Sequence, residues 1–273
     1  MTVTALLYHP VVYTGLLPLA VTLIVCAVPG PAVAWKAAAG LLAAFLLSAW
    51  LAIGSGGMLA WDSTAKLVWA ALPAFALGML CGDRPPWRRV LLGLFAVALP
   101  LWLVAPLLAR EGVDALVRYA YLPLFNVAVL LAFEHGRASS RANLAALLAL
   151  GIAVGLCAAI GASILYGERA FSLVAGVGAL ALRFVLGRDP GASRGVALPV
   201  ALMLCTLAGL GTVYAQVPAL VLLLLACVPW AARLPVPRSW NAAMSLALST
   251  GYGILPGLAA IAYAWVVAGP PAF

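Results

Sequence analysis

The stretch GVALPVALMLCTLAGLGTVYAQVPALVLLLLACVPWAA, from Gly195 to Ala232, contains no charged residue. A helix crosses the hydrocarbon core of a membrane, about 30 Å thick, with roughly 20 apolar residues. The stretch is therefore long enough for two crossings. We expect one membrane-spanning helix over 195–215 and a second over 217–232.

The same length criterion predicts eight further spans, over 10–29, 37–54, 65–82, 90–109, 117–134, 144–166, 170–187 and 241–268. Composition supports this, because 66% of the residues are apolar and 8% are charged, against roughly 25% charged in a soluble domain. Mean hydropathy is +1.16. We predict an all-α, polytopic transmembrane helical bundle of about ten spans, with no soluble domain. The chain, 1–273, is expected to form one integral membrane domain, and a 5+5 division near residue 140, as in inverted-repeat transporters, is the weaker alternative.

Positive charge is distributed unevenly between the expected loops. Eleven of the 15 Lys and Arg residues fall in the odd-numbered loops, and the remaining four fall in the even-numbered ones. Cytoplasmic loops of membrane proteins carry the excess of Lys and Arg. We therefore expect the odd loops in the cytoplasm, both termini outside it, and the chain in the cell (inner) membrane. A signal cleaved at Ala32-Val33-Ala34 would reverse this distribution, so the first helix is expected to stay uncleaved.

All seven carboxylates are expected in loops or at the ends of spans, namely Asp62, Asp83, Glu111, Asp114, Glu134, Glu168 and Asp189. Carriers driven by protons or sodium ions usually hold an ionisable group at membrane depth. The sequence therefore favours a facilitative, channel-like or non-transport role over an ion-coupled one.

Glu134 and His135 are the most promising polar pair in the sequence. The apolar run between Arg118 and Glu134 is short for a span, so one of its ends is expected to be drawn into the membrane by a turn. If that is the Glu134 end, a carboxylate and an imidazole lie together near the interface, where they would relay protons or bind a cationic group. The alternative is a solvated cap beside Arg137 and Arg141.

Two other side chains lie inside expected spans. Asn126 is near the middle of the fifth span, where its amide either links two helices or binds substrate in a cavity. Arg183 is about one turn inside the seventh span. It either extends along the helix to the lipid head groups or faces the bundle and binds an anion.

The last expected span is unusually polar in its first half. Ser249, Thr250, Tyr252 and Gly253 precede Pro256. Glycine and proline at membrane depth often mark a broken helix whose freed backbone groups bind a ligand. The alternative is a kinked helix whose hydroxyls bond back to its own carbonyls.

The basic segment DRPPWRR, 83–89, contains three arginines, Arg84, Arg88 and Arg89. They either anchor the helices on the cytoplasmic side or hold an acidic lipid head group. We expect membrane lipids, and protein partners in a membrane complex, to bind this chain. The net charge of +8 is explained by such loops, so no nucleic-acid partner is expected.

No motif for a nucleotide or another cofactor is present, since the chain has neither a P-loop nor a G-x-G-x-x-G turn. None of the five cysteines forms a CxxC, and we interpret them as small apolar side chains that pack between helices. We expect no cofactor and no bound metal.

The leading functional hypothesis is a passive or weakly coupled carrier or channel for a small neutral or anionic molecule. It depends on the ten spans, the short loops, Asn126 and the polar last span. The second hypothesis is a non-catalytic subunit or assembly factor of a membrane complex. An enzyme that acts on a lipid through Glu134 and His135 ranks last, because the sequence offers no nucleophile beside them.

Overall fold

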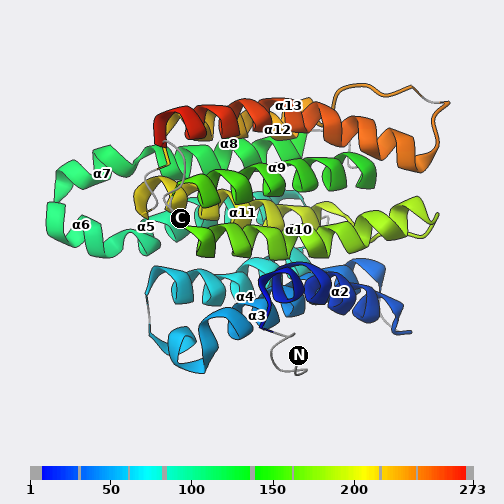
Figure 1. Ribbon diagram of the computed structural model, residues 1–273, viewed down its shortest axis with the longest axis horizontal. Coiled ribbons are helices and arrows are strands. Elements are labelled where there is room, and N and C mark those ends of the chain that lie inside the picture. The colour runs from blue at the N-terminus through cyan, green and yellow to red at the C-terminus, as the bar shows by residue number, and fades with distance from the viewer. Residues whose placement is uncertain are drawn as a thin grey trace.

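A computed structural model describes residues 8–29, 32–60, 62–81, 85–135, 139–161, 163–214, 217–237 and 239–268. Within these ranges all regular structure is helical, and most helices lie roughly side by side in a bundle (Figure 1). The elements are η1 (Val12–Leu16, a π-helix), α2 (Leu17–Ala27), α3 (Val33–Leu59), α4 (Ser63–Cys81), α5 (Pro85–Leu103), α6 (Ala105–Glu111), α7 (Val113–Tyr119), α8 (Tyr121–His135), α9 (Ser140–Ile160), α10 (Ile164–Val185), α11 (Arg194–Tyr214), α12 (Leu220–Ala231) and α13 (Ala242–Ala268).

The described helices confirm a multi-pass helical membrane protein and support the expected number of spans approximately. Seven are long and apolar enough to cross a membrane, and an eighth is formed if α5 and α6, bent by 61°, count as one span. Two further apolar helices, Val12–Ala27 and Leu220–Ala231, are shorter. Each of the ten expected spans therefore corresponds to a helix or a bent pair, but not all are full-length crossings.

Helix α11 forms the centre of the bundle. It packs against α4, α8 and α9, and 89% of its apolar segment is buried, against 22% for α13. Helix α11, which carries no charge after Arg194, is thus the most buried of the candidate membrane spans. In contrast, α13 lies at the edge and leaves most of its surface to lipid (Figure 1).

Close approach between helices depends on small residues. A Cβ placed on Gly167 of α10 would lie 2.9 Å from the backbone oxygen of Gly155 in α9. Glycine is needed there because it lets the two backbones approach. Glycine residues of α9 and α10 therefore form part of the packing surface between these two helices.

Two helix boundaries differ from the sequence expectation. The chain turns at Gly161, so α10 begins at Ile164. It includes Glu168 and Arg169, which were expected in the loop between the sixth and seventh spans. The fifth span is also longer than expected, because an apolar helical segment runs from Leu116 to His135. Arg118 is accommodated in this segment by an ion pair with Glu111 at 2.7 Å.

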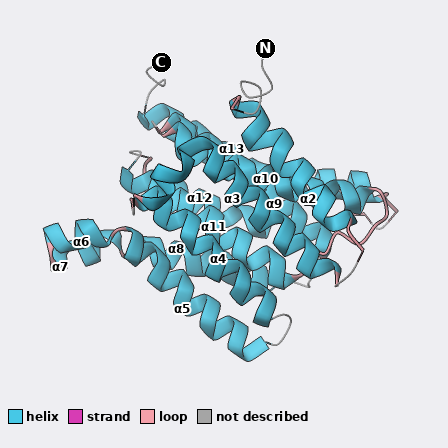
Figure 2. Ribbon diagram, turned by 90° about the horizontal axis from the view of Figure 1, so that it is seen from below, coloured by secondary structure: helices cyan, strands magenta, loops and turns pink. Residues whose placement is uncertain are grey.

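Helices α6 and α7 project from one end of the bundle, at the left of Figure 1 and again in Figure 2. At the other end lie the loop between α10 and α11, the loop between α12 and α13, and the first residues of α9 and α11. We call this second end the loop end.

Candidate functional site

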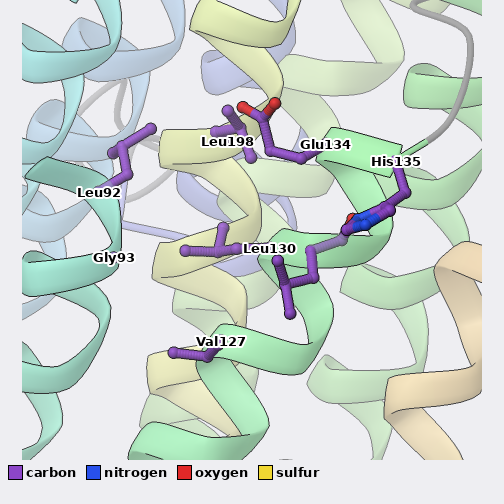
Figure 3. Close-up of a pocket in the computed structure, with 8 residues that line it drawn as sticks. Leu92, Gly93, Val127, Leu130, Glu134, His135 and Leu198 are labelled. Carbon is purple, nitrogen blue, oxygen red and sulfur yellow. The ribbon is translucent and has the colours of Figure 1, made fainter. Parts of the chain in front are cut away.

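A groove of about 420 Å³ lies between α5, α8 and α11 near the loop end. Figure 3 shows its lining side chains, which come from all three helices. The lining residues are Leu92, Gly93, Val127, Leu130, Leu131, Glu134, His135 and Leu198.

The walls of the groove are apolar. Leu92, Leu130 and Leu198 are buried, whereas Leu131 is 46% exposed and stands at the rim. Gly93 widens the groove, since a Cβ placed there would meet no atom within 4 Å. The groove therefore suits an apolar chain.

One end of the groove is polar, because Glu134 and His135 form the last turn of α8. Successive residues of a helix do not face each other, and Figure 3 shows the Glu134 carboxylate directed towards Leu198 while the His135 ring lies on another side of α8. The two side chains thus border the same groove without forming the direct acid–imidazole relay that the sequence suggested.

The contact of His135 defines its tautomer. Its Nδ1 lies 3.0 Å from the carbonyl oxygen of Leu131, one turn back in α8. Because a carbonyl only accepts, Nδ1 carries a hydrogen and donates it. In the neutral ring Nε2 is then an acceptor. The Glu134 carboxylate and the negative end of the α8 dipole both lie at this end of the groove, and both attract positive charge.

Asn126 lies outside the groove. It is 1% exposed, and its Nδ2 donates to the Ala96 carbonyl of α5 at 3.2 Å. The void beside it is only about 10 Å³, too small for a substrate. Asn126 therefore links α8 to α5, which is the first of the two interpretations given to it.

Arg183 faces the protein and not the lipid head groups. Its Nη1 donates to the Cys26 carbonyl at 3.4 Å, and its Nη2 donates to the Asp189 carbonyl at 3.2 Å. It joins the end of α2 to the loop after α10, and it does not border the groove.

The four positions singled out in the last span do not line the groove either; they are Ser249, Thr250, Tyr252 and Gly253. Helix α13 runs unbroken through Pro256, which agrees with the second interpretation, a continuous helix whose hydroxyls bond back to its own carbonyls. Thr250 bonds back to the Leu246 carbonyl at 2.9 Å, Ser249 is fully buried and Tyr252 is half-buried. Gly253 packs against α9, because a Cβ there would lie 2.9 Å from the Ala149 Cβ.

Sequence reasoning missed a buried charge. Arg169 has an exposed fraction of 0% and lies in the second turn of α10. It donates to the Ala49 carbonyl of α3, and its neighbour Glu168 accepts from the Tyr13 hydroxyl. The available signal was Gly161 followed by Ser163, two turn residues inside the expected span 144–166.

Lipid binding was expected at three arginines of the basic segment. Arg84 lies outside the described residues, and the side chains of Arg88 and Arg89 are not described.

The chain matches no family model, no curated protein and no solved structure. Its own geometry defines the class: a multi-pass helical membrane protein with an apolar lateral groove that ends in a carboxylate and an imidazole.

Proposed function

We propose that this protein is a passive or weakly coupled carrier for a small amphiphilic molecule with a cationic head, which it takes from the lipid layer. The observation that carries the proposal is the groove of about 420 Å³ between α5, α8 and α11. Its volume falls within the roughly 300–1,000 Å³ of small-molecule sites, and its mostly apolar lining with few polar groups is typical of them.

The polar end of the groove supports the choice of head group. Glu134 contributes a carboxylate, and α8 contributes the negative end of its dipole. An anionic head would be repelled by both. The proposal therefore replaces the neutral or anionic substrate that the sequence suggested with a cationic one.

The distribution of positive charge supports an orientation. Eleven Lys and Arg residues belong to the odd-numbered expected loops, and placing Arg169 inside α10 removes one positive residue from the even-numbered loops. With the loop end in the cytoplasm of a cell whose inner membrane holds this chain, both termini lie outside. The polar end of the groove then meets the head groups of the cytoplasmic leaflet.

Counterflow in proteoliposomes tests the carrier directly. Vesicles loaded with unlabelled octyltrimethylammonium are expected to take up the radiolabelled cation faster than protein-free vesicles, with saturation. Octanesulfonate has the same chain and the opposite charge, and we expect no uptake of it. Equal rates with and without protein would refute the carrier, and co-purification of one stoichiometric protein partner would favour a subunit of a complex instead.

A further inference from the structure

Arg169 is a fully buried charge that does not line the groove. Its Nη2 reaches the Ala49 carbonyl oxygen of α3 at 3.5 Å, and its Nε and Nη1 have no hydrogen-bond partner among the described residues. Buried polar groups are nearly always satisfied by protein, water or an ion, and an exception calls for a specific explanation. The hydrogens on Nε and Nη1 are therefore available to a further partner.

The adjacent carboxylate does not supply this partner. Glu168 precedes Arg169 in α10, and successive residues of a helix do not face each other. The Glu168 carboxylate instead accepts from the Tyr13 hydroxyl of η1. It acts on Arg169 through space, without a bond to Nε or Nη1. Because its negative charge repels a multiply charged anion, we expect any anionic partner of Arg169 to be monovalent.

A second buried donor, the Ser48 hydroxyl, lies at the same level of the contact between α3 and α10. A Cβ on Gly176 of α10 would lie 2.8 Å from the Leu41 side chain of α3. Arg169 comes earlier in α10 and reaches Ala49, later in α3, so the two helices run antiparallel. Residues seven apart lie on the same face of a helix. Ser48 follows Leu41 by seven positions and Arg169 precedes Gly176 by seven, so Ser48 and Arg169 face the same seam.

The Ser48 hydroxyl is unusual for a membrane helix. Hydroxyls inside a helix commonly bond back to a carbonyl one turn earlier, as Thr206 does to Leu202 at 2.8 Å and Thr250 does to Leu246 at 2.9 Å. Ser48 has an exposed fraction of 0%, and its Oγ has no partner among the described residues. It therefore adds a third unpartnered polar atom to the seam between α3 and α10.

The chemistry of these atoms defines the class of ligand. Arginine N–H groups only donate, and a serine hydroxyl can donate as well, so the partner that suits all three is an acceptor. A positive charge in a low-dielectric interior attracts an anion strongly. Since Arg169 and Ser48 are both completely buried, an anion of one atom requires the least separation of the helices. These conditions describe a halide ion.

Two irregular helical segments flank the seam and provide a way in. Tyr13 belongs to η1, a π-helix that packs on α10, and π-helical turns are frequent at functional sites. Helix α3 is interrupted at Gly54, where φ is +67°, five residues after Ala49. Such positions absorb the backbone changes of a local opening. Both segments lie near the start of α10, at the end of the bundle opposite the loop end.

We propose that Arg169 and Ser48 form a binding site for a halide ion such as chloride in the seam between α3 and α10. Nε and Nη1 of Arg169 and the hydroxyl of Ser48 donate to the ion. The site is independent of the carrier proposal, because neither residue lines the groove.

A scintillation proximity assay with radiolabelled chloride on the full chain in detergent tests the site. We expect saturable binding that unlabelled chloride and bromide displace, and that sulfate and gluconate do not displace at equal sodium concentration. Arg169→Gln is expected to weaken chloride binding at least tenfold. Arg110→Gln, which removes an exposed arginine of α6, should leave it unchanged.

Ser48→Ala keeps the test decisive if Arg169→Gln does not fold, because it removes a single oxygen atom. It is expected to weaken chloride binding at least threefold. Ser249→Ala is the matched control, since Ser249 is also fully buried with an unpartnered Oγ but lies in α13; its binding should equal that of the native chain. Absence of saturable binding, displacement by sulfate as effective as by chloride, or unchanged binding in folded Arg169→Gln or Ser48→Ala chains would overturn the proposal.

Discussion

The guanidinium of Arg169 donates through Nη2 to the carbonyl oxygen of Ala49 at 3.5 Å, and so joins α10 to α3. This is a long bond for a side chain that is completely buried, and the Nε and Nη1 atoms of Arg169 have no hydrogen-bond partner among the described residues. The neighbouring Glu168 is only half-buried and is bonded to Tyr13. Arg169 is thus an incompletely satisfied charge in the protein interior.

Replacing Arg169 by methionine is expected to stabilise the fold. An apolar side chain of similar length removes the desolvation cost of the charge, and such replacements are often neutral or stabilising by about 1–4 kcal/mol. Glu168 reaches the surface and does not become a buried unpaired charge. The midpoint of thermal unfolding in detergent is expected to stay equal or rise in Arg169→Met. It should fall in Arg169→Ala, which leaves a cavity; a large fall in both variants would mean that the charge itself holds α10 to α3.

The sequence predicted the helical bundle because lipid imposes a simple requirement, a long apolar run for each crossing. It did not predict the burial of Arg169, since the break between two expected spans was placed at 167–169. Burial of this arginine depends on Ala49, 120 positions earlier in the chain. Only the packing of α3 on α10 reveals that contact.

The candidate site was likewise predicted from the sequence only in part. Glu134 and His135 were recognised because they end a span. Val127, Leu130 and Glu134 also recur at spacings of three and four, which places them on one face of α8. The opposite walls of the groove are formed by Gly93 of α5 and Leu198 of α11. No local sequence pattern predicts that these two helices are neighbours of α8. A cavity lined by Ala34, Asn143 and Arg194 was missed for the same reason, because three helices and one loop assemble it.

Gly93→Leu is expected to abolish binding of octyltrimethylammonium while the protein stays folded. The new side chain would occupy the groove, and the backbone position is open, since a Cβ at Gly93 meets nothing within 4 Å. Gly178→Leu is the matched control, because Gly178 also has open space around it but lies in α10, away from the groove. Binding to nanodiscs that hold each variant gives the comparison. Undiminished binding by Gly93→Leu would place the ligand elsewhere.

Glu134→Gln is expected to weaken binding of octyltrimethylammonium at least tenfold, or about 1.4 kcal/mol. A pair of opposite charges near a protein surface attracts by about 4 kcal/mol at 4 Å, from which desolvation subtracts a part. Octanesulfonate should bind no worse than before. Asp114→Asn, which removes an exposed carboxylate of α7, provides the control. If both variants lose affinity equally, surface charge explains the effect and Glu134 is not part of the site.

Gly253→Leu and Gly251→Leu separate packing from ligand binding in α13. At Gly253 a Cβ would lie 2.9 Å from the Ala149 Cβ and 3.1 Å from the Ala232 Cβ, whereas Gly251 is exposed with no atom within 4 Å. Overpacking of this kind costs about 1–3 kcal/mol, and leucine in an open helical position gains up to about 1 kcal/mol over glycine. Gly253→Leu should therefore unfold at a lower temperature than the native chain, and Gly251→Leu at an equal or higher one. Counterflow of octyltrimethylammonium by the folded fraction should be unchanged in both, because α13 does not line the groove. A stable Gly253→Leu variant that has lost counterflow would instead indicate that the polar half of α13 lines the transport path.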